Sequence, residues 1–357
     1  MRPPRPLRIA QIAPLFEAVP PKLYGGTERV VAALADALVD LGHEVTVFAS
    51  AESRTRARLH ATRERALRLD ASRLKGETAA HLAMLAEVRR HAAEFDVLHF
   101  HTDLLHLPLF EQHAARCVTT LHGRLDLTDL ERAYRQWPQF GLVSISERQR
   151  VPMPRANWLA TVPHGLPAEA YSMGSGAGGY LAFLGRIAPE KAPDAAIRIA
   201  AAAGLPLKIA AKVDTVDRDY FNTAITPLLA KPGAEFIGEI TDREKPAFLG
   251  DAVALLFPVI WPEPFGLVMI EALACGTPVI AYDAGAVREV IENGVCGYIV
   301  NDEAQALEAL RKIGTLSRAA VRATFERRFT ARRMAEDYLA VYGGLMGMRR
   351  MSRALAV

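Results

Sequence analysis

The chain has 357 residues, of which half are hydrophobic and 23% are charged, and its formal net charge is +3. This length predicts two domains of roughly 100–200 residues each, and the composition excludes an intrinsically disordered chain. The small net charge gives no reason to expect nucleic acid as a partner. No apolar run reaches the roughly 20 residues that a membrane-spanning helix needs.

The three cysteines, Cys117, Cys275 and Cys296, form no C-x-x-C pair, and their odd number argues against a disulfide framework. Residues 1–14 are basic, but their apolar run is too short and too rich in proline for a signal peptide. We therefore expect a cytoplasmic protein in a reducing environment, bound at most to the inner face of a membrane.

Residues 54–75 are locally basic. The basic side chains are Arg54, Arg56, Arg58, Arg63, Arg65, Arg68, Arg73 and Lys75. A solvated helix face or loop is the simpler interpretation, and weak contact with anionic lipid or with an acidic acceptor is the alternative.

In the first half of the chain, short apolar runs alternate with a helical pattern. Buried strands are expected at residues 7–14, 43–50, 95–103, 116–123 and 141–146, and a helix at residues 28–42. The Gly-rich residues 171–179 have the composition of a linker. After them the rhythm restarts, with strands expected at residues 180–186, 205–213, 235–240, 252–260, 277–283 and 297–300 and a helix at residues 193–203. This alternation predicts an α/β fold with two doubly wound parallel sheets.

The segment WPEPFGLVMIEALACGTPVIAYD carries the most information in the chain. Glu263 and Glu271 have seven residues between them, and a helical pattern begins at Gly266. The amides of Phe265, Gly266 and Leu267, at the start of this helix, are expected to point at an anion. A buried glutamate is rare unless it is paired, so the two carboxylates indicate a binding site.

The stretch EPFGLVMIEALACGTPVIA resembles the E-x7-E signature of retaining glycosyltransferases of the GT-B fold in family four, and the resemblance extends over essentially the whole chain. It implies GT-B architecture, which consists of two Rossmann-like domains with parallel sheets facing across a cleft. The domains implied are an acceptor-side domain at 1–170, a linker at 171–179, a nucleotide-sugar-binding domain at 180–328, and a C-terminal helix within 329–357 that packs back on the first domain.

The resemblance assigns roles to the residues of this signature. Glu263 contacts the hydroxyls of the donor sugar near the reacting face and is a candidate catalytic residue. Glu271 holds the ribose, and the backbone at Phe265, Gly266 and Leu267 contacts the sugar and the diphosphate. No protein nucleophile is evident, so the departing phosphate oxygen is expected to take the proton of the acceptor.

The stretch FLGRIAPEKA resembles the G-R-x-x-x-x-K segment of the family, which implies that Arg186 and Lys191 bind the donor diphosphate. Two fixed cations would stabilise the charge that develops on the leaving group. Ala192 departs from the glycine that often follows this lysine. In EFIGEI, the resemblance implies backbone contacts of Gly238 and Ile240 with the nucleoside.

Two motifs of the first domain resemble the family as well. Gly25 and Gly26 correspond to a glycine loop facing the diphosphate, with Thr27 as the expected helix cap. In TTLHGR, His122 is a candidate catalytic residue that contacts the donor sugar or the diphosphate.

Three other positions lie where strands end or domains meet. His101 and Asp103, at the end of a strand, are candidates on the acceptor side. His164 is interpreted as part of the hinge.

Two other motifs are rejected. Gly174, Gly176 and Gly179 spell G-x-G-x-x-G, but they precede a strand, so no NAD site is expected. Asp217 and Asp219 spell D-x-D, and we interpret them as acids at a helix start. No set of His, Cys or Asp residues has the spacing typical of zinc sites, so no metal and no cofactor are expected.

The sequence therefore predicts a retaining, metal-independent hexosyltransferase. A nucleotide sugar, by default UDP-glucose, would be the co-substrate, and the acceptor would be a small molecule, a lipid or a glycan. A GT-B epimerase or phosphorylase is one alternative, and epimerisation of the nucleotide sugar alone would identify the epimerase. A non-catalytic nucleotide-sugar-binding protein is another, and tight binding without turnover would identify it.

Overall fold

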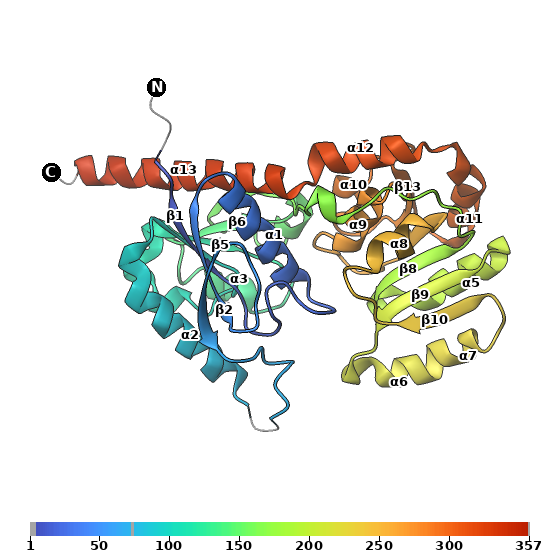
Figure 1. Cartoon of the computed structure of the whole chain (residues 1–357), viewed down its shortest axis with the longest axis horizontal. Coiled ribbons are helices and arrows are strands. Elements are labelled where there is room, and N and C mark those ends of the chain that lie inside the picture. Colours follow the sequence, from blue (N-terminus) through green and yellow to red (C-terminus); the bar gives the residue numbers. More distant parts are fainter. Residues whose placement is uncertain (1–4, 73–74, 356–357) are drawn as a thin grey trace. The chain divides into compact units, whose positions relative to one another are not determined.

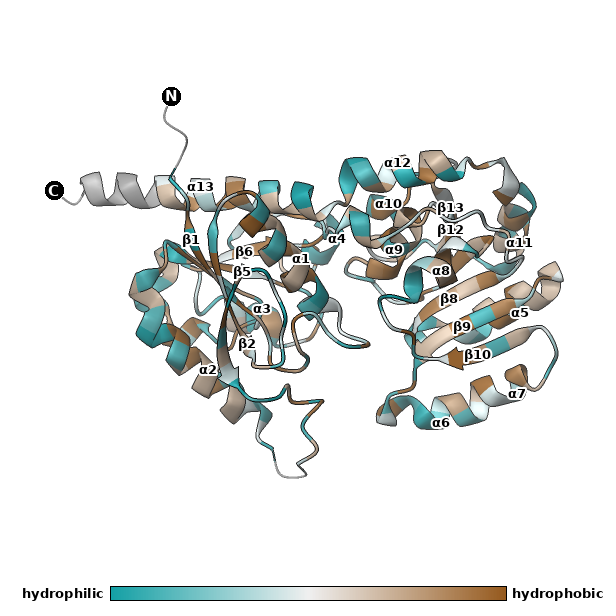
Figure 2. Ribbon diagram, in the orientation of Figure 1, coloured by the Kyte–Doolittle hydropathy of each residue, from teal (hydrophilic) through white to brown (hydrophobic). Residues whose placement is uncertain are grey.

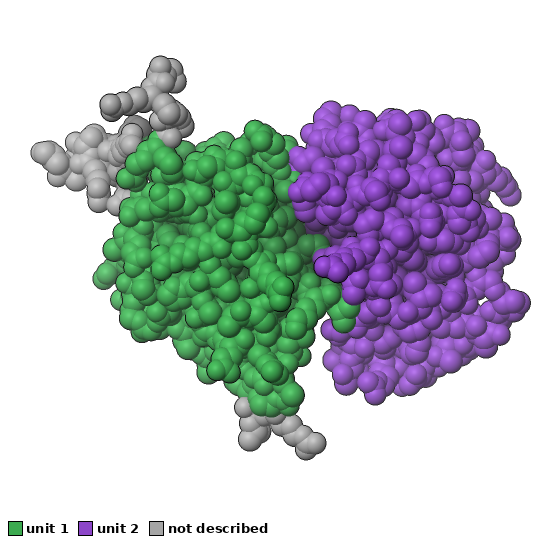
Figure 3. Space-filling model, in the orientation of Figure 1, with its two compact units in different colours: residues 1–165, 331–357 green, residues 166–330 purple. Residues whose placement is uncertain are grey.

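The computed structural model describes residues 5–72 and 75–355. The chain divides into two compact units: unit 1 contains residues 1–165 and 331–357, and unit 2 contains residues 166–330 (Figure 3). Unit 1 is therefore built from both ends of the chain, whereas unit 2 is one continuous stretch. Among the described helices, none combines the length and the apolar character needed to cross a bilayer.

Unit 1 contains a sheet of seven parallel strands in the order β3-β2-β1-β4-β5-β6-β7 (Figure 1). The strands are β1 (Arg8–Ile12), β2 (Glu44–Ser50), β3 (Arg58–Arg63), β4 (Val97–Phe100), β5 (Cys117–Thr120), β6 (Gly141–Ser144) and β7 (Trp158–Thr161). The helices of unit 1 are α1 (Gly26–Asp40), α2 (Glu77–His91), α3 (Leu130–Tyr134), α4 (Glu147–Arg150) and α13 (Ala331–Leu355). Every side chain of β4 and β5 is buried, as expected for a parallel sheet covered on both faces.

The C-terminal helix α13 belongs to unit 1, where it contacts α1 (Figure 1). Its Tyr338 and Tyr342 are among the largest fully buried side chains of the protein. The helix extends from Ala331 to Leu355.

Unit 2 contains a second parallel sheet, with the order β10-β9-β8-β11-β12-β13. The strands are β8 (Leu181–Arg186), β9 (Leu207–Lys212), β10 (Ala234–Gly238), β11 (Ala254–Phe257), β12 (Val279–Tyr282) and β13 (Gly297–Val300). The helices are α5 (Pro193–Ala203), α6 (Arg218–Tyr220), α7 (Thr226–Leu229), α8 (Lys245–Gly250), α9 (Leu267–Ala274), α10 (Val287–Val290), α11 (Glu303–Lys312) and α12 (Arg318–Arg328). Figure 2 shows hydrophobic residues on strands such as β1 and β10 and hydrophilic residues along α12.

The two parallel sheets confirm the predicted α/β fold, and each strand of unit 2 overlaps an apolar run of the sequence. Two strands of unit 1 were not predicted, namely β3 and β7. Both lie at the edges of the sheet, and their residues are only partly buried, so they show no apolar run.

The expectation of a flexible linker at residues 171–179 is wrong. The amide of Gly174 donates to the carbonyl of Cys275 at 3.0 Å, and the amide of Gly176 donates to that of Gly250 at 2.9 Å. A Cβ atom on Gly174 would lie 2.2 Å from the backbone of Gly250. Glycine is therefore needed here because two backbone segments of unit 2 touch, not because the segment is free to move.

Candidate functional site

The turn before α9 is shaped by Gly266, whose φ is +84°. A Cβ atom at this position would lie 2.7 Å from Cε of Met269 and 3.0 Å from the ring of Phe257, so only glycine fits. Helix α9 then begins at Leu267. Helix geometry leaves its first amides without acceptors inside the helix, and the helix dipole adds partial positive charge there. This turn suits an anion, as the sequence predicts.

Glu263 and Lys191, which are far apart in the sequence, form an ion pair. The side chain of Glu263 is 10% exposed and that of Lys191 is 17% exposed. The indole Nε1 of Trp261 donates to Oε2 of the same carboxylate at 2.7 Å, and Nζ of Lys191 lies 4.7 Å from the centre of the Trp261 ring. Lys191 and Glu263, which the sequence predicts to lie in one binding site, are thus brought together, and Trp261 orients both side chains.

The backbone of Glu263 is held by the segment after β12. The amide of Ala286 donates to the carbonyl of Glu263 at 2.9 Å. A Cβ atom on Gly285 would lie 2.2 Å from that carbonyl oxygen. Sequence reasoning missed Trp261 and Gly285; a tryptophan two residues before a functional glutamate was the only local signal.

Arg186, at the end of β8, is surrounded by carboxylates. It pairs with Glu190, donates from Nη1 to Oδ2 of Asp217 at 2.8 Å, and lies 3.9 Å from Asp214. Asp217 directly precedes α6 and Asp219 lies in its first turn, so both are acids at a helix start, as the sequence predicts, and Asp217 is in addition a partner of Arg186. The carboxylates around Arg186 hold its side chain, which the sequence predicts to bind a diphosphate, in a fixed position.

One backbone hydrogen bond links these groups. The amide of Ile260 donates to the carbonyl of Glu190 at 3.0 Å. Glu190 pairs with Arg186 and directly precedes Lys191, which in turn pairs with Glu263. Arg186, Lys191 and Glu263 therefore occupy one region of unit 2, beyond the ends of β8 and β11, where ligands of parallel α/β sheets bind.

Glu271 belongs to a different set of contacts. This carboxylate is 1% exposed on α9, and its Oε1 accepts from Nζ of Lys245 at 2.8 Å and from the hydroxyl of Tyr171 at 3.2 Å. Lys245 also lies 2.9 Å from Asp242. A buried glutamate with a buried lysine is strongly held, because either charge alone would be costly. Sequence reasoning identified Glu271 but missed Lys245 and Tyr171.

Backbone conformation marks two other predicted positions. Ala192, which directly follows Lys191, has a φ of +48°, in the left-handed region that favours glycine. Gly238 ends the edge strand β10 with a φ of +76°, next to a register shift in its pairing with β9. Contact of Gly238 and Ile240 with a nucleoside stays a prediction.

In unit 1, the glycine loop precedes α1. Gly25 is the residue before the helix, and α1 starts at Gly26. Thr27 therefore lies inside the helix, and its expected role as a cap is wrong. A Cβ atom on Gly25 would lie 2.7 Å from Pro21, so the loop requires glycine there. Burial raises the pKa of the nearby carboxyl of Glu28, which accepts from the amide of Glu17 at 3.3 Å.

Three histidines that follow strand ends form a cluster. Nδ1 of His101 and Nε2 of His122 are 2.8 Å apart, and the rings of His122 and His164 stack with their centres at 5.2 Å. Burial lowers the pKa of His122 to about 3. Burial, with the neighbouring histidines, also places the pKa values of His101 and His164 well below their usual range. The cluster is neutral at pH 7, and His164 is part of it.

A chain of buried hydrogen bonds leads from this cluster to α13. Nε2 of His101 lies 2.8 Å from Oε1 of Gln11, and Nε2 of Gln11 lies 3.2 Å from the hydroxyl of Tyr342. That hydroxyl lies 2.8 Å from Nδ1 of His99, whose Nε2 lies 2.7 Å from Oγ1 of Thr120. The chain ends at Tyr338, whose hydroxyl is 2.7 Å from Thr120.

The orientation of the Gln11 amide determines where the protons lie. With Oε1 facing His101, the Nε2–H of His101 donates to Gln11, and its unprotonated Nδ1 accepts from Nε2–H of His122. A neutral His122 then carries a lone pair on Nδ1. Among the described residues, this buried Nδ1 has no hydrogen-bond partner, so it can accept a hydrogen bond from a hydroxyl.

The remaining candidates of unit 1 lie at the surface. Asp103 is exposed and has a φ of +48°. In the basic segment, the observed ion pairs include Arg56 with Asp36 and Asp40, Arg63 with Asp70, and Arg68 with Glu17. Arg73 lies outside the described residues. Contact of this segment with a membrane stays a prediction, and these pairs reduce the charge that it offers.

Comparisons with known proteins agree with this geometry. The family model described as Glycosyltransferase Family 4 matches residues 24–162, and the model described as Glycosyl transferases group 1 matches residues 176–323. A phosphatidyl-myo-inositol mannosyltransferase of Mycolicibacterium smegmatis is 27% identical, over 95% of this chain and 92% of its own length. A D-inositol 3-phosphate glycosyltransferase of Thermobispora bispora is 36% identical, over 49% of this chain and 44% of its own.

Solved structures show the same fold. AviGT4, a glycosyltransferase involved in avilamycin A biosynthesis, has a TM-score of 0.73 at 23% identity, over 96% of this chain and 98% of its own. HepE of Anabaena, in complex with UDP-glucose, has a TM-score of 0.71 at 18% identity, over 95% of this chain and 100% of its own.

The hydrogen-bond chain predicts that Gln11 sets the tautomer of His122. In the variant Gln11→Leu, His101 loses its acceptor, so we expect His122 to populate both neutral tautomers and the free energy of unfolding to fall by about 1–3 kcal/mol. Nitrogen NMR of the histidine rings measures the tautomers, and denaturant unfolding measures stability. Tyr338→Phe, at the far end of the chain, is the control: it should lower stability without changing His122. An unchanged His122 spectrum in Gln11→Leu contradicts the assignment.

Because several buried histidines are neutral in the folded chain, we expect the free energy of unfolding to decrease as the pH is lowered. Burial holds the pKa values of His99, His101, His106 and His164 below the unfolded value of 6.5. Below pH 6.5 the unfolded chain therefore binds protons that the folded chain does not. For each histidine the free energy of unfolding then decreases by about 1.4 kcal/mol per pH unit. Urea unfolding between pH 7 and pH 5, above the range of most carboxylates, should show this loss. A flat profile in that window would contradict it.

Proposed function

Since the chain belongs to family four of the glycosyltransferases, with the GT-B fold, we propose that it transfers a hexose from a nucleoside-diphosphate sugar to an acceptor hydroxyl with retention of configuration at the anomeric carbon. The observation that carries this proposal is the ion pair of Lys191 with Glu263, oriented by Trp261, in the segment that leads into α9. A cation, a carboxylate and the amide end of a helix suit a diphosphate linked to a sugar.

The charges in this region match the needs of the leaving group. Breaking the bond between sugar and phosphate leaves additional negative charge on the diphosphate. Lys191, Arg186 and the first amides of α9 supply positive charge for it. The two cations are paired with Glu263, Glu190 and Asp217. A bound diphosphate would take over these cations and release Glu263 to accept a hydrogen bond from a sugar hydroxyl.

Retention follows from a reaction on one face of the sugar. The donor diphosphate leaves from that face, the acceptor hydroxyl arrives on it, and the departing phosphate oxygen takes the proton of the acceptor. The proposed reaction needs no metal, because Arg186, Lys191 and the helix end supply the positive charge that a metal ion supplies in other enzymes.

The comparisons suggest which substrates to test first. UDP-glucose is our proposed donor, since it is bound in the HepE structure of the same fold. Mannose donors belong beside it, because one relative is named a mannosyltransferase. The names of two relatives contain inositol, so inositol and inositol phosphate, free or in a lipid, are the first acceptors among small molecules, lipids and glycans.

The decisive experiment incubates the purified protein with each donor, with and without these acceptors and with and without a chelator. Release of the nucleoside diphosphate is measured, together with the anomeric configuration of the product by proton NMR. We expect acceptor-dependent release and retained configuration, and a chelator should have no effect on the rate. Inverted configuration contradicts the mechanism, an epimerised donor identifies an epimerase, and binding without turnover identifies a binding protein.

The first variant to test is Lys191→Met, which keeps the length of the side chain and removes its charge. We expect kcat to fall by roughly 100-fold or more, as for other groups that stabilise charge in a transition state. Lys208→Met is the matched control, because Lys208 also lies over an aromatic ring of unit 2, that of Tyr180, at 4.5 Å. Equal rates for the two variants would contradict the role of Lys191.

Variants of Arg186 and of its partner Asp217 should have opposite effects. Arg186→Ala should lower kcat/KM by roughly 100-fold or more while circular dichroism stays unchanged. Asp217→Asn removes a carboxylate that competes with the diphosphate, and it should lower the Kd of the nucleoside diphosphate by roughly 2- to 5-fold. Initial rates measure the effect of Arg186→Ala, and isothermal titration calorimetry measures the Kd of Asp217→Asn. Weaker binding in Asp217→Asn would show that this carboxylate positions Arg186 and does not compete with the ligand.

A further inference from the structure

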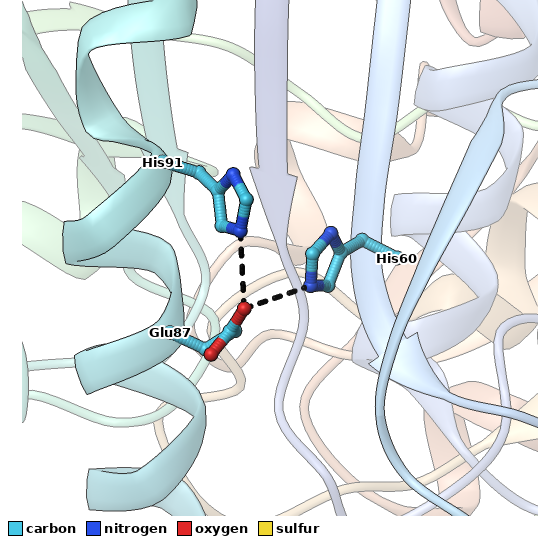
Figure 4. A group of neighbouring side chains, drawn as sticks. All are labelled: His60, Glu87 and His91. Carbon is cyan, nitrogen blue, oxygen red and sulfur yellow. Dashed lines mark hydrogen bonds and ion pairs between the residues drawn. The ribbon is translucent and has the colours of Figure 1, made fainter.

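Outside the residues discussed so far, unit 1 contains a cluster of two histidines and a glutamate at the edge of its sheet. His60 lies on β3, the edge strand, and Glu87 and His91 lie one turn apart on α2. Figure 4 shows both imidazole rings turned toward the same carboxylate. Among the described residues, this is the one group of three or more His, Cys, Asp or Glu side chains whose ligand atoms all lie within 4.8 Å of one another.

From this cluster we propose a zinc site formed by Nε2 of His60, Nε2 of His91 and Oε1 of Glu87, with water as the fourth ligand. Two histidines and one glutamate are a ligand set that Zn²⁺ takes in proteins. Figure 4 shows the three side chains reaching one point from two different elements. The ion would join α2 to the edge strand β3, which has a single neighbour in the sheet.

The separations of the ligand atoms fit a tetrahedral ion. With bonds of about 2.0–2.1 Å, neighbouring ligands of tetrahedral zinc lie about 3.3 Å apart. Oε1 of Glu87 lies 3.4 Å from Nε2 of His60 and 3.1 Å from Nε2 of His91. Two edges of the tetrahedron are therefore in place, and the third edge requires only small rotations of partly exposed side chains.

The groups behind the ligands also fit a metal site. Nδ1 of His91 lies 2.7 Å from Oε1 of Glu94, so a carboxylate orients this imidazole and directs its Nε2 to the site. The other oxygen of Glu87 pairs with Arg90, which leaves Oε1 for the ion. The ring of His60 stacks on Phe48 of β2, with the ring centres at 4.6 Å, which fixes its position.

The site is also accessible to an ion. The side chains of His60, Glu87 and His91 are 24%, 26% and 34% exposed, so an ion can enter from solvent without unfolding of the chain. Sequence spacing did not reveal the site, because His60 is far from the helix along the chain. None of its residues takes part in the proposed transfer, so the zinc proposal is independent of the proposed function.

The test uses the full-length protein after removal of metals with a chelator. Zn²⁺ is titrated in competition with a chromophoric indicator, and we expect one ion per chain and a rise of Tm. The double variant His60→Gln/His91→Gln should bind at least 100-fold more weakly and lose the shift of Tm. His113→Gln, which changes another partly buried histidine of unit 1, should behave like the wild type. Mg²⁺, which prefers oxygen ligands, should not shift Tm.

A spectrum locates the ion independently of stability. Co²⁺ in a site with nitrogen and oxygen ligands in tetrahedral arrangement gives intense visible bands, which we expect in the wild type and in His113→Gln but not in the double variant. Circular dichroism confirms that the double variant is folded. Zinc affinity or cobalt bands that persist in the folded double variant would overturn the proposal, as would a wild-type protein that binds neither ion.

Discussion

Unit 1 depends on the chain of buried hydrogen bonds that connects its central strands to the last helix. Gln11, His99 and Tyr342 are completely buried, and burial of such groups is tolerated only when their polar atoms have partners. Tyr342 lies 331 positions beyond Gln11 in the sequence. The core of unit 1 is therefore complete only when the chain has passed through all of unit 2 and returned. Unit 2, which is continuous, contains all of its own strands without that return.

In unit 2, the groups that need partners because of their burial are charged and not neutral. Lys191, Arg186 and Lys245 each pair with a carboxylate in the absence of ligand, because an unpaired charge in a partly buried position is unfavourable. The three pairs differ in burial. Lys245 and Glu271 are 7% and 1% exposed, whereas Arg186 is 26% exposed. The more exposed pairs are those that the proposed diphosphate would exchange at modest cost, and the buried pair is the one that keeps α8 and α9 together.

The sequence predicted those features that depend on neighbours along the chain. Apolar runs predicted all strands of unit 2 and the central strands of unit 1. Strand β3 was missed because none of its residues is buried and its sequence, RLHATR, contains no apolar run. The pairings that define the site depend on contacts between distant segments, such as Lys245 with Glu271 and Gln11 with Tyr342, and no local pattern reports them. Composition misled at residues 171–179, because it cannot distinguish glycines needed for flexibility from glycines needed for close contact.

The protonation of His122 decides between the two roles that the sequence left open for it. A histidine that binds a diphosphate must donate a hydrogen bond, and it does so best as a cation. Burial lowers the pKa of His122 to about 3, so it carries no charge at neutral pH. Its Nε2–H is already used by His101, and its Nδ1, which has no hydrogen-bond partner in the described part of the chain, presents a lone pair that would repel phosphate oxygens. The same lone pair can accept a hydrogen bond from a hydroxyl, so in the proposed transfer His122 would contact a sugar hydroxyl and not the diphosphate.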